Sequence, residues 1–325
     1  MTEKPSGSEK KESNNAMAMM RAMSSGVAGL KAHQTALDVI GNNIANVNTY
    51  GFKASRTLFS DILYQTLTSA TAPDDTTGAG GLNPSQVGYG ATASAVQVDT
   101  GRAGMATTGR SNDCYINGEG YFVVADGAPA TTGGAAPSSY KYTRVGALSF
   151  DSAGYLVDSN GNRVCGIPVN TPNDLLNATL DTSVSVPRYI HYDTSQSLSD
   201  ISIAADGTIT ALLDGSVVTI GQIEIAHFVN PAGLEQMGGN YYKATDNSGN
   251  ATIESDGSIT SAGLSFETPG SSATGNLVTG ALESSNVDLA NEFSNMITTE
   301  RGYQANSKII TVADEMLETL VSMVR

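Results

Sequence analysis

Tryptophan is absent from the chain, aromatic residues make up only 6%, and just two cysteines occur among 325 residues. Basic residues are also scarce: 17 Lys and Arg stand against 32 Asp and Glu, which gives a formal net charge of -15. Proteins that bind nucleic acid need clustered Lys and Arg to contact phosphates, so this balance argues against a nucleic-acid partner. The spacing of Cys114 and Cys165 matches no zinc or redox motif, and we expect two small buried thiols on strands.

Long hydrophobic runs are missing as well. No window contains about 18 uninterrupted apolar residues, the length that a membrane-spanning helix requires, so we predict no membrane insertion. The stretch from Met1 to Asn15 is polar, and Arg21 interrupts the short apolar patch from Met17 to Met23, which does not resemble a cleaved secretory signal. Because residues 1–18 contain few hydrophobic side chains, we expect them to form a disordered tail.

Residues suited to catalysis or metal binding are few. His33, His191 and His227 stand without Cys, Asp or Glu at ligand spacing, which gives a metal site or a His-based catalytic centre little support. A hydrolase would also need converging carboxylates or a nucleophile–base pair, which the sequence does not display. We therefore predict that the chain is not an enzyme, with no catalytic residues, no cofactor and no metal.

Two glycine-containing segments match ligand-binding loops only in part. The segment Gly88 to Ala93 (GYGATA) lacks the third glycine of a dinucleotide fingerprint and follows no βαβ pattern. The segment Asp158 to Asn162 (DSNGN) begins like a calcium loop, but Arg163 and Val169 occupy the positions that require Gly and Glu. We interpret the first segment as a loop and the second as a turn.

What the sequence does contain is an apolar seam at each end. In the C-terminal part every seventh residue is apolar, which predicts a long amphipathic helix with the seam Leu289, Met296, Tyr303, Ile310, Leu317 and Val324. Near the N-terminus a second helix has the seam Met23, Leu30, Leu37 and Ile44. Four residues after each of the first five C-terminal seam positions stand Phe293, Glu300, Ser307, Asp314 and Val321, apolar only at the ends. We infer a packing environment less symmetrical than a two-stranded zipper.

Between the helices the chain has the signals of an antiparallel β structure. Five hairpin dipeptides stand beside apolar stretches: Asn117-Gly118, Asn160-Gly161, Asp206-Gly207, Asp214-Gly215 and Asp256-Gly257. In the segment Ile201 to Val229 such turns alternate with short strands, which predicts an antiparallel meander.

Five segments, in one order, resemble those of a known family. The run Gly41 to Lys53 is rich in Asn and reads as a helix end that turns a corner, with Gly51 able to supply a positive φ. It lies within LDVIGNNIANVNTYGFKASRTLF (Leu37 to Phe59), which is similar to the N-terminal signature of the bacterial flagellar rod and hook axial proteins. The signature residues are Asn42, Asn43, Asn46, Gly51, Phe52 and Lys53.

The other four matching segments follow in the family's order. The C-terminal signature is resembled by ALESSNVDLANEFSNMITTERGYQANSKIITVADEMLETLV (Ala281 to Val321). Between the two signatures lie INGEGYFVV (Ile116 to Val124), YTRVGALSFDSAGYLVDSNGNRVCG (Tyr142 to Gly166) and NPAGLEQMGGNYY (Asn230 to Tyr242). Together they cover nearly all of the chain after the expected tail.

The resemblance implies an α+β fold. The long N- and C-terminal helices, residues 19–50 and 284–325, would pack together as one discontinuous, coiled-coil-like inner domain. Residues 51–110 would form a connecting segment that begins with a short helix, Thr57 to Leu67. Antiparallel β structure would fill residues 111–283 as the outer part, with a small excursion at 171–200.

The resemblance also implies a function and partners. We expect a structural subunit of the flagellar hook, whose copies self-assemble through the seam residues into a hollow, flexible helical tube that transmits torque between rod and filament. The implied partners are further copies of the chain, the distal rod, hook cap and hook–filament junction proteins, and the flagellar export apparatus. The implied location is the extracellular flagellum, at the hook and basal body, reached without a cleaved signal peptide.

Two alternatives stay open. The first is the distal rod protein of the basal body, a straight and rigid version of the same architecture; we favour the hook because ALESSNVDL and ERGYQANSKII look closer to hook sequences. The second is a secreted β-rich adhesin with helical termini for anchoring, which the turn-rich acidic middle allows. An adhesin should bind a carbohydrate or a surface as a monomer, whereas an axial subunit should form tubes.

Overall fold

A computed structural model describes residues 7–73, 80–126, 137, 139–172, 174–181, 186–253, 259–271 and 274–323. The chain divides into two compact units. The helical unit comprises Met1–Ala45, Ser55–Val98 and Val287–Arg325, and the β unit comprises Asn46–Ala54 and Asp99–Asn286. The expected connecting segment 51–110 is therefore divided, because most of it belongs with the helices and both of its ends belong with the strands.

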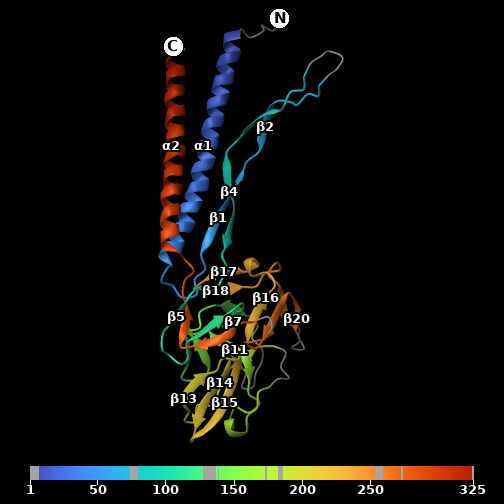
Figure 1. Cartoon of the computed structure of the whole chain (residues 1–325), viewed down its shortest axis with the longest axis vertical. Coiled ribbons are helices and arrows are strands. Elements are labelled where there is room, and N and C mark those ends of the chain that lie inside the picture. The colour runs from blue at the N-terminus through green and yellow to red at the C-terminus, as the bar shows by residue number, and fades with distance from the viewer. Residues whose placement is uncertain are drawn as a thin grey trace. The chain divides into compact units, whose positions relative to one another are not determined.

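Two long helices form the helical unit, as the apolar seams predict. Helix α1 spans Gly7–Ala45 and helix α2 spans Leu289–Met323, and they run side by side (Figure 1). Asp288 caps α2, since its Oδ1 accepts the backbone N–H groups of Ala290 at 2.9 Å and Asn291 at 3.4 Å. A carboxylate at this position also interacts favourably with the positive end of the helix dipole.

The expectation of a disordered tail over residues 1–18 is wrong for the part that the structure describes, because α1 begins at Gly7. Residues 8–25 contain Lys, Glu, Ala and Met and neither Gly nor Pro, so helix propensity extends well before the first seam residue. Residues 1–6 lie outside the described residues.

A pair of antiparallel ribbons completes the helical unit. Strand β1 (Ser55–Asp61) pairs with β4 (Ala91–Val98), and β2 (Tyr64–Thr68) pairs with β3 (Ser85–Gly88). In Figure 1, β1 and β4 run beside α1, which both strands contact. The expectation of a short helix from Thr57 to Leu67 is wrong, because strand pairing with residues 17 to 43 positions later overrides the local sequence preference.

In the described part of the β unit, one antiparallel sheet contains thirteen strands. Eight of them follow each other across the sheet in the order β13 (Ser199–Ile203), β14 (Thr208–Leu213), β15 (Ser216–Ile223), β11 (Arg163–Pro168), β7 (Tyr121–Ala125), β8 (Lys141–Thr143), β18 (Tyr241–Lys243) and β17 (Glu235–Gly238). Branching from this path are β9 (Leu148–Phe150), β10 (Leu156–Asp158), β12 (Arg188–Tyr189), β16 (Ile225–Phe228) and β21 (Leu264–Glu267).

Smaller elements complete the β unit. Three two-stranded pairs are β5 (Met105–Thr107) with β23 (Ala281–Glu283), β6 (Cys114–Asn117) with β22 (Asn276–Thr279), and β19 (Asn250–Ile253) with β20 (Ile259–Ala262). Two short 3-10 helices, η1 (Leu175–Asn177) and η2 (Pro231–Gly233), lie in connections. Part of the expected excursion at 171–200 is built into the sheet through β12, while residues 173 and 182–185 lie outside the described part.

The meander predicted for Ile201 to Val229 is confirmed. Strands β13, β14 and β15 pair in chain order, and the β14–β15 turn has φ of 50° at Asp214 and 82° at Gly215. Two successive positive φ values are the geometry of the tight type I′ hairpin that an Asp-Gly dipeptide favours. The expected turn at Asp256-Gly257 lies outside the described residues.

Strand β7 divides the core of the β unit. Its side chains alternate between two apolar clusters, with Phe122 and Val124 in one cluster and Tyr121, Val123 and Ala125 in the other. A strand buried on both faces requires a continuous apolar run, which explains the sequence YFVVA. Cys114 and Cys165 are buried free thiols, one in each cluster, as expected. Burial raises the pKa of Cys114 to about 12 and also raises that of Cys165, so neither thiol is reactive at neutral pH.

Candidate assembly surface

The seam of α2 is only partly covered within one chain. Met296, Ile310 and Leu317 are half-buried, while Leu289 and Tyr303 are each 39% exposed and Val324 lies outside the described residues. The covered companion row stands three residues after the seam positions, at Glu292, Thr299, Asn306 and Ala313. The row four residues after each seam position, from Phe293 to Val321, is exposed.

Glycines bring α1 and α2 close together. A β-carbon at Gly29 would lie 2.8 Å from Nδ2 of Asn306, and one at Gly26 would lie 3.2 Å from Cγ1 of Ile310. On the other helix, a β-carbon at Gly302 would lie 2.7 Å from Cε1 of His33. The small side chains therefore permit a close approach that the heptad seam alone does not show. The predicted α1 seam residues are all half-buried and border this contact: Met23, Leu30, Leu37 and Ile44.

The helical unit buries little apolar surface. Among its described residues, the buried apolar side chains are Ala32, Ala36, Ile40 and Ala313. Its exposed large apolar side chains are far more numerous: Met20, Val27, Leu58, Phe59, Leu63, Tyr64, Leu67, Leu82, Val87, Tyr89, Val96, Leu289, Phe293, Ile297, Tyr303, Ile309, Val312, Met316 and Val321. Extensive exposed apolar surface marks sites of association between proteins.

Asn43 links the end of α1 to β1 and α2 through hydrogen bonds. Its side chain, which is 1% exposed, donates from Nδ2 to the carbonyl of Ser55 at 2.7 Å, and its Oδ1 accepts the N–H of Ser55 at 3.0 Å. Nδ2 also lies 3.3 Å from Oε1 of Glu292, in the first turn of α2. A single amide thus satisfies the backbone at the start of β1 and contacts α2, which explains a buried Asn at this position. Asn42, by contrast, is exposed on the surface of α1.

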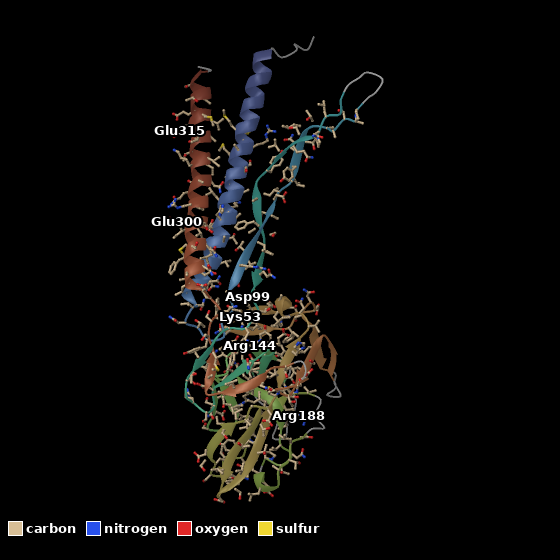
Figure 2. The ribbon with its side chains drawn as sticks, in the orientation of Figure 1. Lys53, Asp99, Arg144, Arg188, Glu300 and Glu315 are labelled. Atoms are coloured by element: carbon tan, nitrogen blue, oxygen red, sulfur yellow. The ribbon has the colours of Figure 1, made fainter. Side chains whose placement is uncertain are left out.

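In the β unit, Lys53 is the centre of a buried charge cluster. Its Nζ donates to Oε1 of Glu283 at 2.6 Å and to the carbonyl of Gly101 at 2.8 Å. The other carboxylate oxygen of Glu283 lies 3.5 Å from Nη1 of Arg144, and Ala103 N–H donates to Oε1 at 3.0 Å. Lys53 and Glu283 are each 1% exposed and Arg144 is 4% exposed. Figure 2 labels Lys53 and Arg144.

Electrostatics make each member of this cluster depend on the others. Burial lowers the pKa of Lys53, and the neighbouring Glu283 carboxylate opposes that shift. Arg144 also donates to the carbonyl of Gly118 at 3.0 Å and stacks over the ring of Tyr121, with its Cζ 5.1 Å from the centroid. Burying charges is tolerable only where partners replace their water, so the loss of Glu283 would leave both cations without their ion-pair partner.

Other signature residues determine the backbone conformation of the segment before Lys53. Gly51 has a φ of 70°, and its N–H donates to the carbonyl of Glu283 at 2.8 Å. A β-carbon there would lie 2.9 Å from Cγ2 of Val145, so both the backbone conformation and the space require glycine. Asn46 accepts a hydrogen bond from Thr49 Oγ1 at 3.1 Å, and Phe52 is half-buried.

The structure thus brings Gly51 and Lys53 together with Glu283 and Arg144, which the sequence analysis did not select. The sequence did contain a sign of this pairing, because Glu283 is a carboxylate within the C-terminal signature and Lys53 is the cation of the N-terminal signature. Asn286 was missed as well. Its Oδ1 accepts the N–H of Ala54 at 2.7 Å and its Nδ2 donates to the carbonyl of Asp99 at 3.1 Å.

Each of the three histidines has a different neighbour. His33 packs against Phe59 in the helical unit with ring centroids 5.7 Å apart. In the β unit, His191 packs against Tyr155, and Nε2 of His227 lies 3.5 Å from Oε2 of Glu119. Among the residues that the structure describes, no group of three or more His, Cys, Asp or Glu could hold a metal ion. Within the same residues, neither α1 nor α2 has a stretch apolar enough to cross a membrane.

The calcium-like segment is a turn, as interpreted from the sequence. Oδ1 of Asp158 accepts the N–H groups of Asn160 and Asn162, each at 2.9 Å. Tyr241 donates its hydroxyl to Oδ2 at 2.5 Å. Because N–H and O–H donors occupy both carboxylate oxygens, Asp158 closes the turn rather than binding a cation.

Comparison with known proteins identifies the family. Three family models match in chain order: "Flagella basal body rod protein" over residues 23–53, "Flagellar hook protein FlgE/F/G D1 domain" over 115–211, and "Flagellar basal body rod FlgEFG protein C-terminal" over 278–323. The first of these covers the signature residues Asn42 to Lys53, and the last covers the α2 seam from Leu289 to Leu317.

Curated relatives extend over nearly the whole chain. The flagellar basal-body rod protein FlgG of Bacillus subtilis (strain 168) is 37% identical over 308 residues, which cover 94% of this chain and 100% of the relative. FlgG of Borreliella burgdorferi is 35% identical over 303 residues, or 92% and 97% of the two chains. The flagellar hook protein FlgE of Borreliella burgdorferi is 25% identical over 465 aligned positions, covering 94% and 100%. The chain therefore belongs to the family of bacterial flagellar rod and hook axial proteins, which are structural proteins of the flagellum and not enzymes.

Proposed function

We propose that this chain is a structural subunit of the distal rod of the flagellar basal body, where its copies self-assemble into a helical tube. The rod-protein relatives support this assignment because they are 32–37% identical over 90% or more of the chain. The hook protein is only 25% identical, and its alignment extends over 465 positions although this chain has 325 residues. The comparisons therefore favour the rod alternative over the hook function preferred from sequence.

The observation that supports self-assembly is the small buried apolar core of the helical unit compared with the length of its two helices. Its two helices span 39 and 35 residues, yet its buried apolar side chains among the described residues are three alanines and one isoleucine. Ordering that many residues opposes folding by on the order of 1 to 2 kcal/mol each, which such a small core does not offset. Burial of the exposed apolar side chains against neighbouring copies would supply the missing stabilisation.

The proposal extends to partners and location. As a flagellar axial component, the chain interacts with other flagellar structural proteins; we place the proximal parts of the rod on one side of it and the hook on the other. Delivery by the flagellar export apparatus is part of the same proposal and rests on the family resemblance. An adhesin is disfavoured because exposed apolar residues concentrate in the helical unit rather than forming a patch on the β unit.

A deletion strain tests the rod assignment. Loss of a distal rod subunit should leave a truncated rod without a hook, whereas loss of a hook subunit should leave a complete rod. Electron microscopy of purified basal bodies distinguishes these outcomes, and complementation with the intact gene is the control. A complete rod in the deletion strain would refute the assignment. A purified protein that binds a glycan as a monomer and never polymerises would instead favour the adhesin.

A further inference from the structure

Helix α2 has a second apolar stripe that does not face α1. Ile309, Val312 and Met316 are 47%, 38% and 44% exposed, and their spacing of three and four residues places them on one side of the helix. The row that packs against α1 contains Asn306, Ile310 and Ala313. At about 100° per residue, the two rows lie roughly a quarter-turn apart on α2. The second stripe is therefore free to contact another molecule.

Helix α1 also lines a groove beside the glycine face that contacts α2. An open groove of about 670 Å³ is lined by Met20, Met23, Val27 and Lys31 of α1, with Ile62 and Ala91 on its other wall. These α1 residues recur every three or four positions and form one face. Gly26 and Gly29, which contact α2 of the same chain, lie on average a little over a third of a turn away around α1. No described residue of α2 lines the groove, so the described part of α2 in the same chain does not fill it.

Charge makes the stripe and the groove complementary. Between residues 19 and 37 of α1 the charged side chains are Arg21 and Lys31, both basic. Between residues 309 and 323 of α2 they are Asp314, Glu315 and Glu318, all acidic, and the basic Lys308 stands just before Ile309. Glu315 immediately precedes Met316 of the stripe and is labelled on α2 in Figure 2. Opposite charges beside an apolar contact guide the approach of two surfaces and fix their register.

We propose that the stripe Ile309, Val312 and Met316 of one copy docks into the α1 groove of a second copy, with Glu315 beside Lys31. The anchor spacing i, i+3, i+7 is that of a helix bound in an apolar groove, and the two groove methionines adapt to the shape of the incoming side chains. The contact joins different surfaces of identical chains, so it leaves a free stripe and a free groove at its two ends and propagates as a helical filament. This inference rests on the proposed self-assembly and names the contact that carries it.

Cross-linking between two singly substituted proteins tests the contact. Val27→Cys protein is mixed with Val312→Cys protein, assembled and then oxidised; the native thiols are buried and should not react. We expect a covalent dimer that contains one chain of each kind. The matched control replaces Val312→Cys by Ile297→Cys, an exposed apolar position of α2 outside the stripe, and should give no dimer with Val27→Cys. Cross-linking by Ile297→Cys but not by Val312→Cys would overturn the proposed docking and leave the proposed function standing.

Charge reversal provides a second test with full-length chains. Lys31→Glu and Glu315→Lys should each raise the concentration needed for assembly by roughly two- to fivefold, and the double variant should restore it. Glu300→Lys, the same change on the same helix but outside the stripe, should not rescue Lys31→Glu. If the double variant assembles no better than the single ones, the proposed register is refuted. If the unmodified protein forms no polymer under any condition, the proposed function fails and the contact fails with it.

Discussion

Nζ of Lys53 and Oε1 of Glu283 lie 2.6 Å apart although 230 residues separate them in sequence. Both side chains are buried, and Arg144 shares the same carboxylate. Glu283 therefore compensates two cations, and it is the carboxylate that forms the ion pair with each of them. The three charged side chains should therefore contribute unequally to the stability of the β unit, and substitutions can measure the difference.

Removal of Glu283 should destabilise the β unit more than removal of Lys53. We expect Glu283→Ala to lower the free energy of unfolding by about 3 to 5 kcal/mol, because it leaves two buried cations uncompensated. Lys53→Met should cost less, since Arg144 still pairs with the carboxylate and the apolar chain keeps its packing. Urea unfolding followed by circular dichroism measures both. Lys141→Met, at the more exposed Lys141–Asp126 pair, is the control and should change the value by at most about 1 kcal/mol.

Substitutions at two glycines of α1 should distinguish the contribution of α1–α2 packing to stability from the contribution of helix propensity. Gly29→Leu should weaken the contact between α1 and α2, because even its β-carbon overlaps the side chain of Asn306. Gly41→Leu, in the same helix, has no neighbour within 4 Å of its β-carbon and should stabilise α1 by about 0.5 to 1 kcal/mol. The thermal transition of the helical signal at 222 nm distinguishes the two variants. Equal shifts of that transition would show that α1 and α2 do not pack as described.

Stability of the β unit should fall as the pH rises through neutrality because of Glu224. Burial raises the pKa of this carboxyl from 4.5 to about 7. Below pH 4.5 the carboxyl is protonated in both the folded and the unfolded state. Between 4.5 and 7 the unfolded chain loses the proton first, so folding becomes progressively less favourable. At pH 8 we expect Glu224→Gln to stabilise the β unit by about 1 to 3 kcal/mol.

The control for this pH dependence is the comparison at low pH. Glu224→Gln and the unmodified chain should have the same denaturation midpoint at pH 4, and Glu235→Gln, at an exposed position of β17, should change it at neither pH. If Glu224→Gln gave no stabilisation at pH 8, the carboxylate would have to be solvated in the folded protein.

Acidic substitutions in the seam should abolish assembly while sparing the β unit. Ile310→Asp places a charge against Gly26 of α1, and Leu317→Asp places one in the same half-buried row. Ser307→Ala and Asp314→Ala, at exposed positions, should matter less. Negative-stain microscopy reports polymer formation, and the urea transition reports the fold of the β unit. Normal polymers from both Asp variants would show that the seam has no part in assembly.

Much of the architecture could be predicted from periodicity and turn chemistry. The seven-residue repeats located both helices, and Asp214-Gly215 located a hairpin, because these signals act over a few residues. The strand β1 could not be found in this way, since its pairing with β4 depends on residues distant in the chain. The start of α1 was misplaced because a polar composition was taken as disorder, although Lys and Glu are good helix formers.

The assembly surface was predictable only in outline. The seam residues Met296, Ile310 and Leu317 do lie near α1, but the close approach depends on glycines that leave no trace in an apolar repeat. Similarly, Lys53 was selected from the family signature, whereas its partner Glu283 required three-dimensional contact to be recognised. Residue types predict which groups must be satisfied, but not which distant group satisfies them.

The contact between Asn43 and Glu292 spans 249 residues. A ribosome adds roughly 5 to 20 residues per second, so the N-terminal helix of each nascent chain is complete about 10 to 50 seconds before its partner begins to be made. Helices form and melt within microseconds, so helix formation does not limit the rate during this interval. Instead, the first helix is exposed without its partner for the whole interval. Throughout translation of the strand-rich middle, the glycine face of the first helix remains open to any other molecule in the cell.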